Sequence, residues 1–386
     1  MAVNKLDITM MEDVGTSASQ LLQRDGSGNI PALDGSQLIG VTEFTTLTSD
    51  PAIDTNPAGG VGTLWYNKTG GEMYVCTDAT AGENVWINVG AGSGNVQQGL
   101  HGEAYGYCAG GGNPVLDVVD KYSFTSDSNA VDVGNLTAID QGIFGHQSKT
   151  KGYAIGGGET NIEVLVFASG GNMVNQTGSL QVNVNGVATG ISSFDHGYRA
   201  AGLPAGSFNG IERFPFASDS NGSDHGDIAS ARAQPTGTNS FTHGYCMKGY
   251  TGTTGSNIID KFAFASNVTG TDVGDATNIG DSFGGCSSET YGYCHGGNLY
   301  ATGGWAYHNV IQKVSFTSDA NAIDVGDLLG NHGSQSGTSS ETYGYIAGGG
   351  PPNLNTILKH SFITDGNATD VADLTASRRD TAGFHV

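Results

Sequence analysis

The sequence predicts an all-β protein whose larger part repeats one four-stranded unit six times. A Gly-Tyr pair, followed by a short run that ends in glycines, begins at residues 106, 152, 197, 244, 292 and 344, so successive pairs lie 46, 45, 47, 48 and 52 residues apart. The 15 Phe, 15 Tyr and 3 Trp residues recur in register with this repeat, which favours order despite 63 glycines in 386 residues. A period of about fifty residues, with turn glycines and no helical pattern, is typical of the blades of a β-propeller.

Residues 1–42 do not read as an ordinary domain. Single apolar residues such as Leu21, Ile30 and Leu38 are separated by polar turn residues. Such a segment buries little apolar surface by itself. We expect it to be extended and to be ordered by packing against copies of itself or another protein; the alternative is a flexible tail.

Residues 43–95 are expected to form a small β module that ends in a Gly/Ser-rich linker. The predicted strands, which alternate with turn sequences, are residues 62–67, 72–76 and 85–89. We expect Trp65, Tyr74 and Trp86 to form an aromatic core, with exposed stacking on sugars as the alternative. The glycine-rich run at 90–94 predicts flexibility of the linker.

Residues 96–386 are predicted to form a six-bladed propeller. We name the four strands of each unit a, b, c and d in chain order. Strand b is the Gly-Tyr run, and strand a precedes it. Strand c is an alternating run such as residues 259–264, whose period of two gives it two distinct faces. Strand d is a run such as residues 323–328, and the second unit looks degenerate because Val-Leu-Val-Phe at 164–167 replaces the usual strand c.

The two ends of this region both look like strand a. If residues 98–104 and residues 380–386 both count as strand a, the six units would have seven such strands. We therefore expect residues 380–386 to return and complete the first unit, because this closure leaves no open sheet edge.

The paired glycines that end strand b, at this period, resemble the Kelch propeller repeat over residues 98–386, although the regularly placed tryptophan of ordinary Kelch units is missing. The fuller phrase is Gly-Tyr, glycines, Asp-Lys-Phe/Tyr-Ser/Ala-Phe, then Ser-Asp-x-Asn-Ala-x-Asp-Val-Gly-Asp/Asn-Leu. It resembles the propeller repeat in tail-fibre and other virion proteins of marine bacteriophages, notably cyanophages. The phrases at 24–35 and 62–67 resemble the same fibre proteins. This resemblance implies a particle-attachment segment, a β module and a terminal propeller. We expect the protein to be a homotrimer.

The composition excludes several classes of partner. The formal net charge is -22 and only 15 residues are Lys or Arg, so we expect neither nucleic acid nor an anionic membrane surface as a partner. The sequence shows no apolar run for membrane insertion and no signal peptide. We expect assembly in a host cytoplasm, which is compatible with later action in a virion outside the cell.

The cysteines predict neither a disulfide scaffold nor a metal site. Their number, five, is odd and their spacing shows no close pairing. Cys108, Cys246 and Cys294 share one repeat position that elsewhere carries Ala154, Ile346 or the exceptional Arg199. A buried thiol there would act as a small hydrophobic group. Because a metal would need ligands that converge from separate units, we expect no metal and no cofactor.

Catalytic chemistry is not indicated. The ten histidines are scattered, unlike the His/Tyr copper site of galactose oxidase, and most arginines lie at unmatched repeat positions, unlike the arginine cluster of sialidases. Because fold alone does not settle function, we judge catalysis from these residues. We therefore predict a protein that is not an enzyme. The acidic turns between strands c and d, at 127–132 and 319–324, either bind calcium or contain Asp and Asn as turn formers, which we favour.

One connection between strands b and c is longer than its counterparts. It spans 16 residues from Gly297 to Lys313, whereas two others span 9. Aromatic side chains stack on sugars or anchor protein partners when they are exposed. The alternative is that this loop packs on its own blade or on an adjacent subunit. The candidate receptor-contact residues in the loop are Tyr300, Trp305, Tyr307 and His308.

Together these features predict a phage virion structural protein, a tail fibre or receptor-binding adhesin. Its N-terminal segment would bind other tail or adaptor proteins of the virion, and its propeller would contact a host surface glycan or protein. The alternatives are a virion decoration or fibre-adaptor protein that binds no receptor, a Kelch-type secreted enzyme, and an intracellular scaffold that binds peptides.

Overall fold

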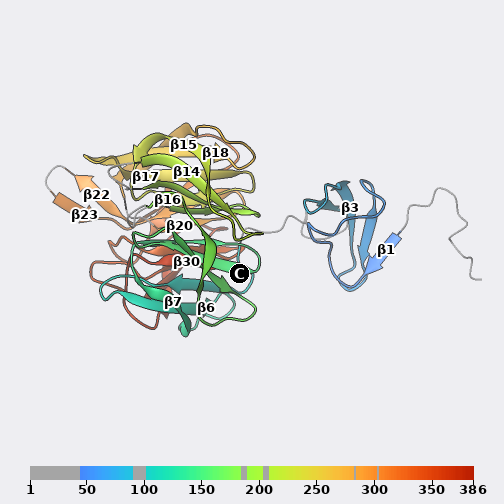
Figure 1. Cartoon of the computed structure of the whole chain (residues 1–386), viewed down its shortest axis with the longest axis horizontal. Helices are drawn as coiled ribbons and strands as arrows, with labels where there is room; N and C mark the ends of the chain where they lie inside the picture. Colours follow the sequence, from blue (N-terminus) through green and yellow to red (C-terminus); the bar gives the residue numbers. More distant parts are fainter. Residues whose placement is uncertain (1–43, 90–100, 184–188, 203–207, 282–283, 302–303) are drawn as a thin grey trace, which may run out of the picture. The chain divides into compact units, whose positions relative to one another are not determined.

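A computed structural model of the chain describes residues 44–89, 101–183, 189–202, 208–281, 284–301 and 304–386 (Figure 1). These residues form thirty strands and no helix, so the predicted all-β class is confirmed for this part of the chain. The chain divides into two compact units, Met1–Gln98 and Gly99–Val386. The expected attachment segment, residues 1–42, and the linker at 90–94 lie outside the described residues.

The first unit contains one four-stranded sheet. Its strands, in spatial order, are β1 (Phe44–Leu47), β2 (Leu64–Asn67), β3 (Glu72–Asp78) and β4 (Val85–Asn88). The last three match the predicted strands, whereas β1, which pairs with β2 in parallel, was not predicted. Trp65, Tyr74 and Trp86 are buried and form the core with Cys76, as expected. The rings of Trp65 and Trp86 meet edge to face at 5.6 Å.

The second unit contains six four-stranded antiparallel sheets, each in the strand order a, b, c, d. Sheet 1 comprises β30 (Ala382–His385), β5 (Tyr105–Ala109), β6 (Leu116–Ser123) and β7 (Val131–Asp140). Sheet 2 comprises β8 (Ile143–Gln147), β9 (Lys151–Gly156), β10 (Asn161–Val166) and β11 (Val174–Ser179). Sheet 3 comprises β12 (Thr189–Ser192), β13 (His196–Gly202), β14 (Phe208–Pro215) and β15 (Ser223–Arg232).

The remaining three sheets follow the same order. Sheet 4 comprises β16 (Thr236–Asn239), β17 (His243–Tyr250), β18 (Gly255–Ala263) and β19 (Thr271–Gly280). Sheet 5 comprises β20 (Gly284–Ser287), β21 (Tyr291–His295), β24 (Val310–Ser315) and β25 (Ile323–Asp327). Sheet 6 comprises β26 (Ser336–Ser339), β27 (Tyr343–Ala347), β28 (Thr356–Ser361) and β29 (Thr369–Asp373). A separate hairpin, β22 (Asn298–Ala301) and β23 (Gly304–Tyr307), is inserted in sheet 5.

Two sequence predictions about these sheets have clear outcomes. The C-terminal strand β30 pairs with β5, with Ala382 opposite Ala109 and His385 opposite Gly106, so the return of residues 380–386 to the first unit is confirmed. The second unit is not degenerate in structure, because β10 pairs with β9 and β11 like any other strand c.

The recurrence of the Gly-Tyr pairs is explained by contacts between successive sheets. Each tyrosine is buried, and its ring lies 4.6–5.1 Å from a phenylalanine that follows strand c of the next sheet. The sixth contact joins sheet 6 back to sheet 1. Aromatic pairs at this distance add to the apolar area that they bury. The pairs are Tyr107–Phe167, Tyr153–Phe216, Tyr198–Phe264, Tyr245–Phe316, Tyr293–Phe362 and Tyr345–Phe124.

The acidic turns between strands c and d also join neighbouring sheets. The carboxylate of Asp127 accepts a hydrogen bond from Lys359 Nζ of sheet 6 at 2.8 Å. Asn129 Oδ1 accepts a hydrogen bond from the Asp373 amide at 3.1 Å. The same arrangement recurs at Asp319, which pairs with Lys261 at 2.9 Å. Oxygens considered as calcium ligands, those of Asp127, Asn129 and Asp319, thus bind side chains and amides of the adjacent sheet.

Buried carboxylates form a second set of links between sheets. Asp120 on β6 accepts hydrogen bonds from the Thr375 amide at 2.9 Å and from Arg378 at 2.8 Å. Asp260 lies 2.6 Å from Arg232 of sheet 3. Glu212 lies 3.0 Å from Arg199 within sheet 3 and accepts a hydrogen bond from the amide of Gln181, which follows sheet 2. All six charged side chains of these pairs are at most 5% exposed. Arg199, the exception at its repeat position in the sequence, is therefore a buried ion-pair partner.

Candidate functional site

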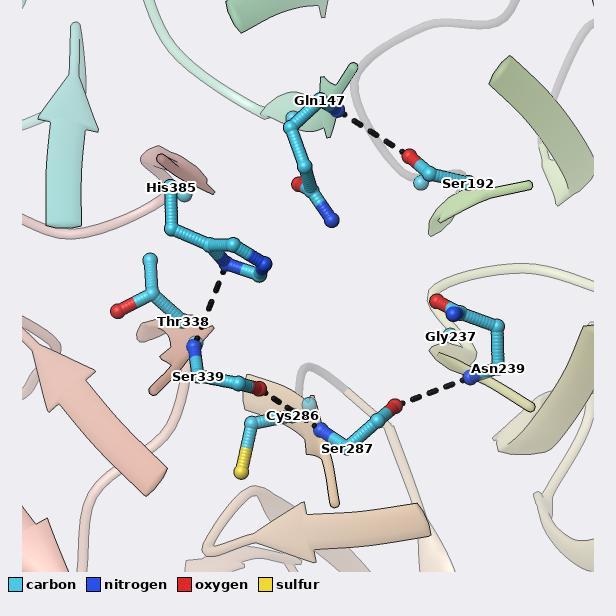
Figure 2. A pocket seen from close by; sticks show the side chains of 14 residues that line it. Gln147, Ser192, Gly237, Asn239, Cys286, Ser287, Thr338, Ser339 and His385 are labelled. Atoms are coloured by element: carbon cyan, nitrogen blue, oxygen red, sulfur yellow. Dashed lines mark hydrogen bonds between the residues drawn. The ribbon is translucent and has the colours of Figure 1, made fainter. Parts of the chain in front are cut away.

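The strands a of the six sheets meet around a small polar pocket (Figure 2). Successive strands a contact one another, from β30 to β8 and onward through β12, β16, β20 and β26 back to β30. Each strand contributes a glycine and, two residues later, a polar residue. The glycines are Gly145, Gly190, Gly237, Gly285, Gly337 and Gly383, and the polar residues are Gln147, Ser192, Asn239, Ser287, Ser339 and His385.

Glycine is required here because the strands a approach one another too closely for a side chain. A Cβ on Gly337 would lie 2.0 Å from the carbonyl oxygen of Gly285. The equivalent Cβ on Gly145 would lie 2.1 Å from the carbonyl oxygen of Gly383, and that on Gly190 would lie 2.1 Å from that of Gly145. Real Cβ atoms do not approach an oxygen this closely, so each glycine permits contact with the preceding sheet.

The backbone amides of the polar residues two positions later donate hydrogen bonds to side chains of the next strand a. The amide of Ser287 donates to Ser339 Oγ at 3.0 Å, and the amide of Asn239 donates to Ser287 Oγ at 3.0 Å. The Ser339 amide donates to His385 Nδ1 at 3.3 Å, which places the proton of a neutral His385 on Nε2. Gln147 makes a similar bond to Ser192 Oγ at 3.2 Å (Figure 2).

The pocket can hydrogen-bond water or a small neutral molecule. Its lining consists of glycines, hydroxyls, two carboxamides, one imidazole and one thiol, and no carboxylate is among these lining residues. Because most of the hydroxyls already accept backbone hydrogen bonds, this pocket is best explained as the polar seam between the six strands. These residues were not predicted as a site from the sequence.

The predicted receptor-contact residues lie in and beside the inserted hairpin. In Figure 1, β22 and β23 extend away from the sheets of the second unit. Their backbones pair in antiparallel register, with Tyr300 opposite Trp305 and Tyr307 opposite Asn298. Tyr307 is half-buried. The long b–c connection therefore forms a hairpin of its own.

Buried polar groups anchor the base of this hairpin. Asn298 and Asp281 exchange two backbone hydrogen bonds, at 2.9 and 3.1 Å, and Asn298 Nδ2 donates to Asp281 Oδ1 at 3.0 Å. His308, whose amide donates to the Gly297 carbonyl at 3.1 Å, is only 7% exposed. Burial, with a smaller contribution from Lys248, lowers the pKa of His308 to about 3. His308 thus lies at the anchored base, in contrast to the exposed position expected from the sequence.

The chain enters the second unit at the end opposite to the hairpin. The amide of Gly102 donates to the carbonyl of Ser339, the last residue of strand a of sheet 6 before the turn into strand b, at 2.8 Å. The amide of Ala104 donates to the carbonyl of the last residue, Val386, at 2.8 Å. A turn between strands a and b and a connection between strands b and c lie at opposite ends of strand b.

No protein family matches this chain, and no curated protein is similar to it in sequence. Among the described residues, no helix has the length and apolar character needed to span a membrane.

Proposed function

We propose that residues 99–386 form a six-bladed, Kelch-like β-propeller. The support is the circuit of contacts between the strands a, together with the six Tyr–Phe contacts that run from each sheet to the next and from sheet 6 to sheet 1. The pairing of β30 with β5 joins the two ends of the chain segment within one sheet. Such an arrangement leaves only short outer edges and gives a rigid support for loops.

We further propose that the protein is a non-enzymatic phage virion component, a tail fibre or adhesin that binds a host surface glycan or protein. The observation that carries this proposal is the hairpin β22–β23, an aromatic-rich insertion with a buried polar anchor on an otherwise repetitive framework. Evolution of a simple spacer would not require such an insertion. Repeat phrases that resemble those of marine phage fibre proteins support the virion assignment.

The proposed arrangement separates attachment from binding. The N-terminal segment would bind tail or adaptor proteins of the virion and form a homotrimer, and the chain enters the second unit at the end opposite to β22–β23. The hairpin end is then free to contact the host. Several copies on one particle would turn weak individual contacts into stable attachment.

The experiment is a binding assay of the full-length protein on immobilised lipopolysaccharides and capsular polysaccharides from marine cyanobacteria. We expect Trp305→Ala to weaken binding at least about tenfold, because a stacked aromatic side chain contributes on the order of 1–2 kcal/mol or more. The matched control is Tyr343→Ala, since Tyr343 is a partly exposed aromatic residue at the opposite end of the strands.

The outcomes separate a receptor-binding protein from a decoration or adaptor protein. Binding that is lost in Tyr343→Ala and retained in Trp305→Ala would place the contact at the wrong end for this proposal. No binding by the wild-type protein to these polysaccharides or to intact cells would overturn the receptor-binding role and favour a decoration or adaptor protein.

A further inference from the structure

Three metal-ligating side chains converge in the interior between sheets 5 and 6. Cys286 lies on β20, His295 on β21 and His360 on β28, and the three are at most 5% exposed. Cys286 Sγ lies 3.6 Å from His295 Nε2 and 3.7 Å from His360 Nε2, and the two Nε2 atoms are 2.9 Å apart. Among the described residues this is the one group of three or more His, Cys, Asp or Glu side chains close enough to share a metal ion.

The internal repeat shows that the two histidines are unusual at their positions. The position of His295, two residues after the buried tyrosine of strand b, carries apolar residues in the other five sheets. They are Ala109, Ile155, Ala200, Met247 and Ala347. The position of His360, opposite the glycine of the Gly-Tyr pair, is also apolar in the other five sheets. Those residues are Tyr122, Leu165, Phe214, Phe262 and Val314.

Ordinary packing therefore does not account for this interface. A single sheet pair combines two histidines with a thiol, where the other pairs carry apolar or aromatic residues at both histidine positions. Gly344 leaves space for them, since a Cβ there would lie 2.4 Å from His360 Nε2 and 2.6 Å from Cys286 Sγ. Burying neutral imidazoles carries a desolvation cost that Phe or Ala would avoid.

The tautomer of His295 matches what a metal requires. His295 Nδ1 lies 3.2 Å from the Gly284 carbonyl oxygen. A carbonyl only accepts, so Nδ1 carries the proton and the lone pair of Nε2 faces Cys286 and His360. This arrangement, with the second ring nitrogen bound to a carbonyl, is the usual support of a metal-bound histidine.

The distances are close to those of a bound site. With metal–sulfur and metal–nitrogen bonds of about 2.3 and 2.0–2.1 Å and angles of about 110–120°, ligand atoms lie about 3.3–3.8 Å apart. The two sulfur–nitrogen distances, 3.6 and 3.7 Å, already fall in this range. The 2.9 Å nitrogen–nitrogen distance needs to open by about half an ångström. Cys286 also lines the central pocket, which gives an ion a polar route to the thiol.

We propose that Cys286, His295 and His360 bind a thiophilic metal ion, Zn²⁺ or Cu⁺, that links sheet 5 to sheet 6. One thiolate and two imidazoles suit both ions. Binding breaks the S–H bond of Cys286, forms a metal–sulfur bond and releases the proton to solvent. This inference does not depend on the proposed receptor-binding role.

The test uses the full-length protein, freed of metal with a chelator and kept reduced. Zn²⁺ is added in competition with a chromophoric chelator, and Cu⁺ in a separate anaerobic titration. We expect about one tightly bound ion per chain and a rise in Tm of at least about 5 °C at saturation. Binding of Cu⁺ alone would support the site and assign it to copper.

Variants copied from other sheets keep the test independent of misfolding. His360→Phe introduces the residue that this position carries in sheets 3 and 4, and His295→Ala introduces the residue that its position carries in sheets 1, 3 and 6. They are expected to fold, as checked by circular dichroism, yet to lose at least about tenfold in affinity and the rise in Tm. Cys294→Ala, which copies Ala154, changes a buried thiol outside the cluster and should retain both. Absence of tight binding in the folded wild-type protein, or unchanged binding in both histidine variants, would overturn the proposal.

Discussion

Replacing Gly337 by alanine is expected to lower the free energy of unfolding by at least about 3 kcal/mol. Gly337 lies on β26, where an added Cβ would be 2.0 Å from the carbonyl oxygen and 2.6 Å from the carbonyl carbon of Gly285 on β20. Both neighbours are backbone atoms, so no side chain can rotate away. Relief requires that β26 move outward from β20, which would disturb the hydrogen bond from Ser287 to Ser339 as well.

Gly284→Ala is the matched control, since Gly284 also lies on a strand a and next to Gly285. A Cβ there would find its nearest neighbour, the Gln335 carbonyl oxygen, at 3.4 Å, which is an ordinary contact. We expect a change within about 1 kcal/mol for this variant. Urea unfolding followed by fluorescence measures both. Equal stability of the Gly337 and Gly284 variants would show that the strands a are not packed as closely as described.

Asp120→Ala is expected to destabilise the protein by about 3–5 kcal/mol, because it leaves the buried guanidinium of Arg378 without its charged partner. Both side chains are fully buried, 2.8 Å apart. Thr375, which follows the last strand of sheet 6, also donates to Asp120 through its amide and its hydroxyl, at 2.9 and 2.7 Å. One carboxylate of sheet 1 therefore binds two residues of the segment between β29 and β30.

Asp127→Ala provides the comparison for an exposed ion pair. Asp127 also pairs with a cation of sheet 6, Lys359, but its side chain is 45% exposed. Solvent screening limits such a pair to about 1 kcal/mol or less. Chemical denaturation of both variants at low and at high salt tests the contrast. A loss at Asp120 no larger than that at Asp127 would contradict the assignment of Asp120 as a buried link.

Features repeated in the sequence were predictable because each copy reinforces the others. The Gly-Tyr pairs gave the number of units and their strand order, and the surplus strand-a run at the C-terminus indicated that β30 completes sheet 1. The aromatic core of the first unit was predictable for a simpler reason: Trp65, Tyr74 and Trp86 lie on short alternating strands with no other core residues of comparable size.

The close packing of the strands a could not be predicted, because it depends on contacts between units. A repeated sequence indicates such contacts only when its copies are compared position by position. Every strand a contains glycine followed two residues later by a polar residue, as in Gly337 and Ser339, and this pattern was available in the sequence. Its meaning depends on how closely the strands approach, which a single strand does not show.

The Cys/His/His cluster was missed for the same reason. His295 and His360 are 65 residues apart, in different units, and look like scattered histidines until sheets 5 and 6 are placed side by side. The position of His308 was misjudged because the long connection forms a hairpin whose ordered base buries this residue.

Hydrogen–deuterium exchange of the intact protein tests most directly the claim that the C-terminal strand joins the two ends of the repeat region. Residues at a chain terminus ordinarily fray and exchange within seconds. In this structure β30 pairs along its length with β5, and the Val386 amide donates to the Tyr105 carbonyl at 3.0 Å. We predict that the amides of residues 382–386 exchange as slowly as those of β8 and β26, through global unfolding alone. Rapid exchange of residues 382–386 in an otherwise protected protein would contradict this account.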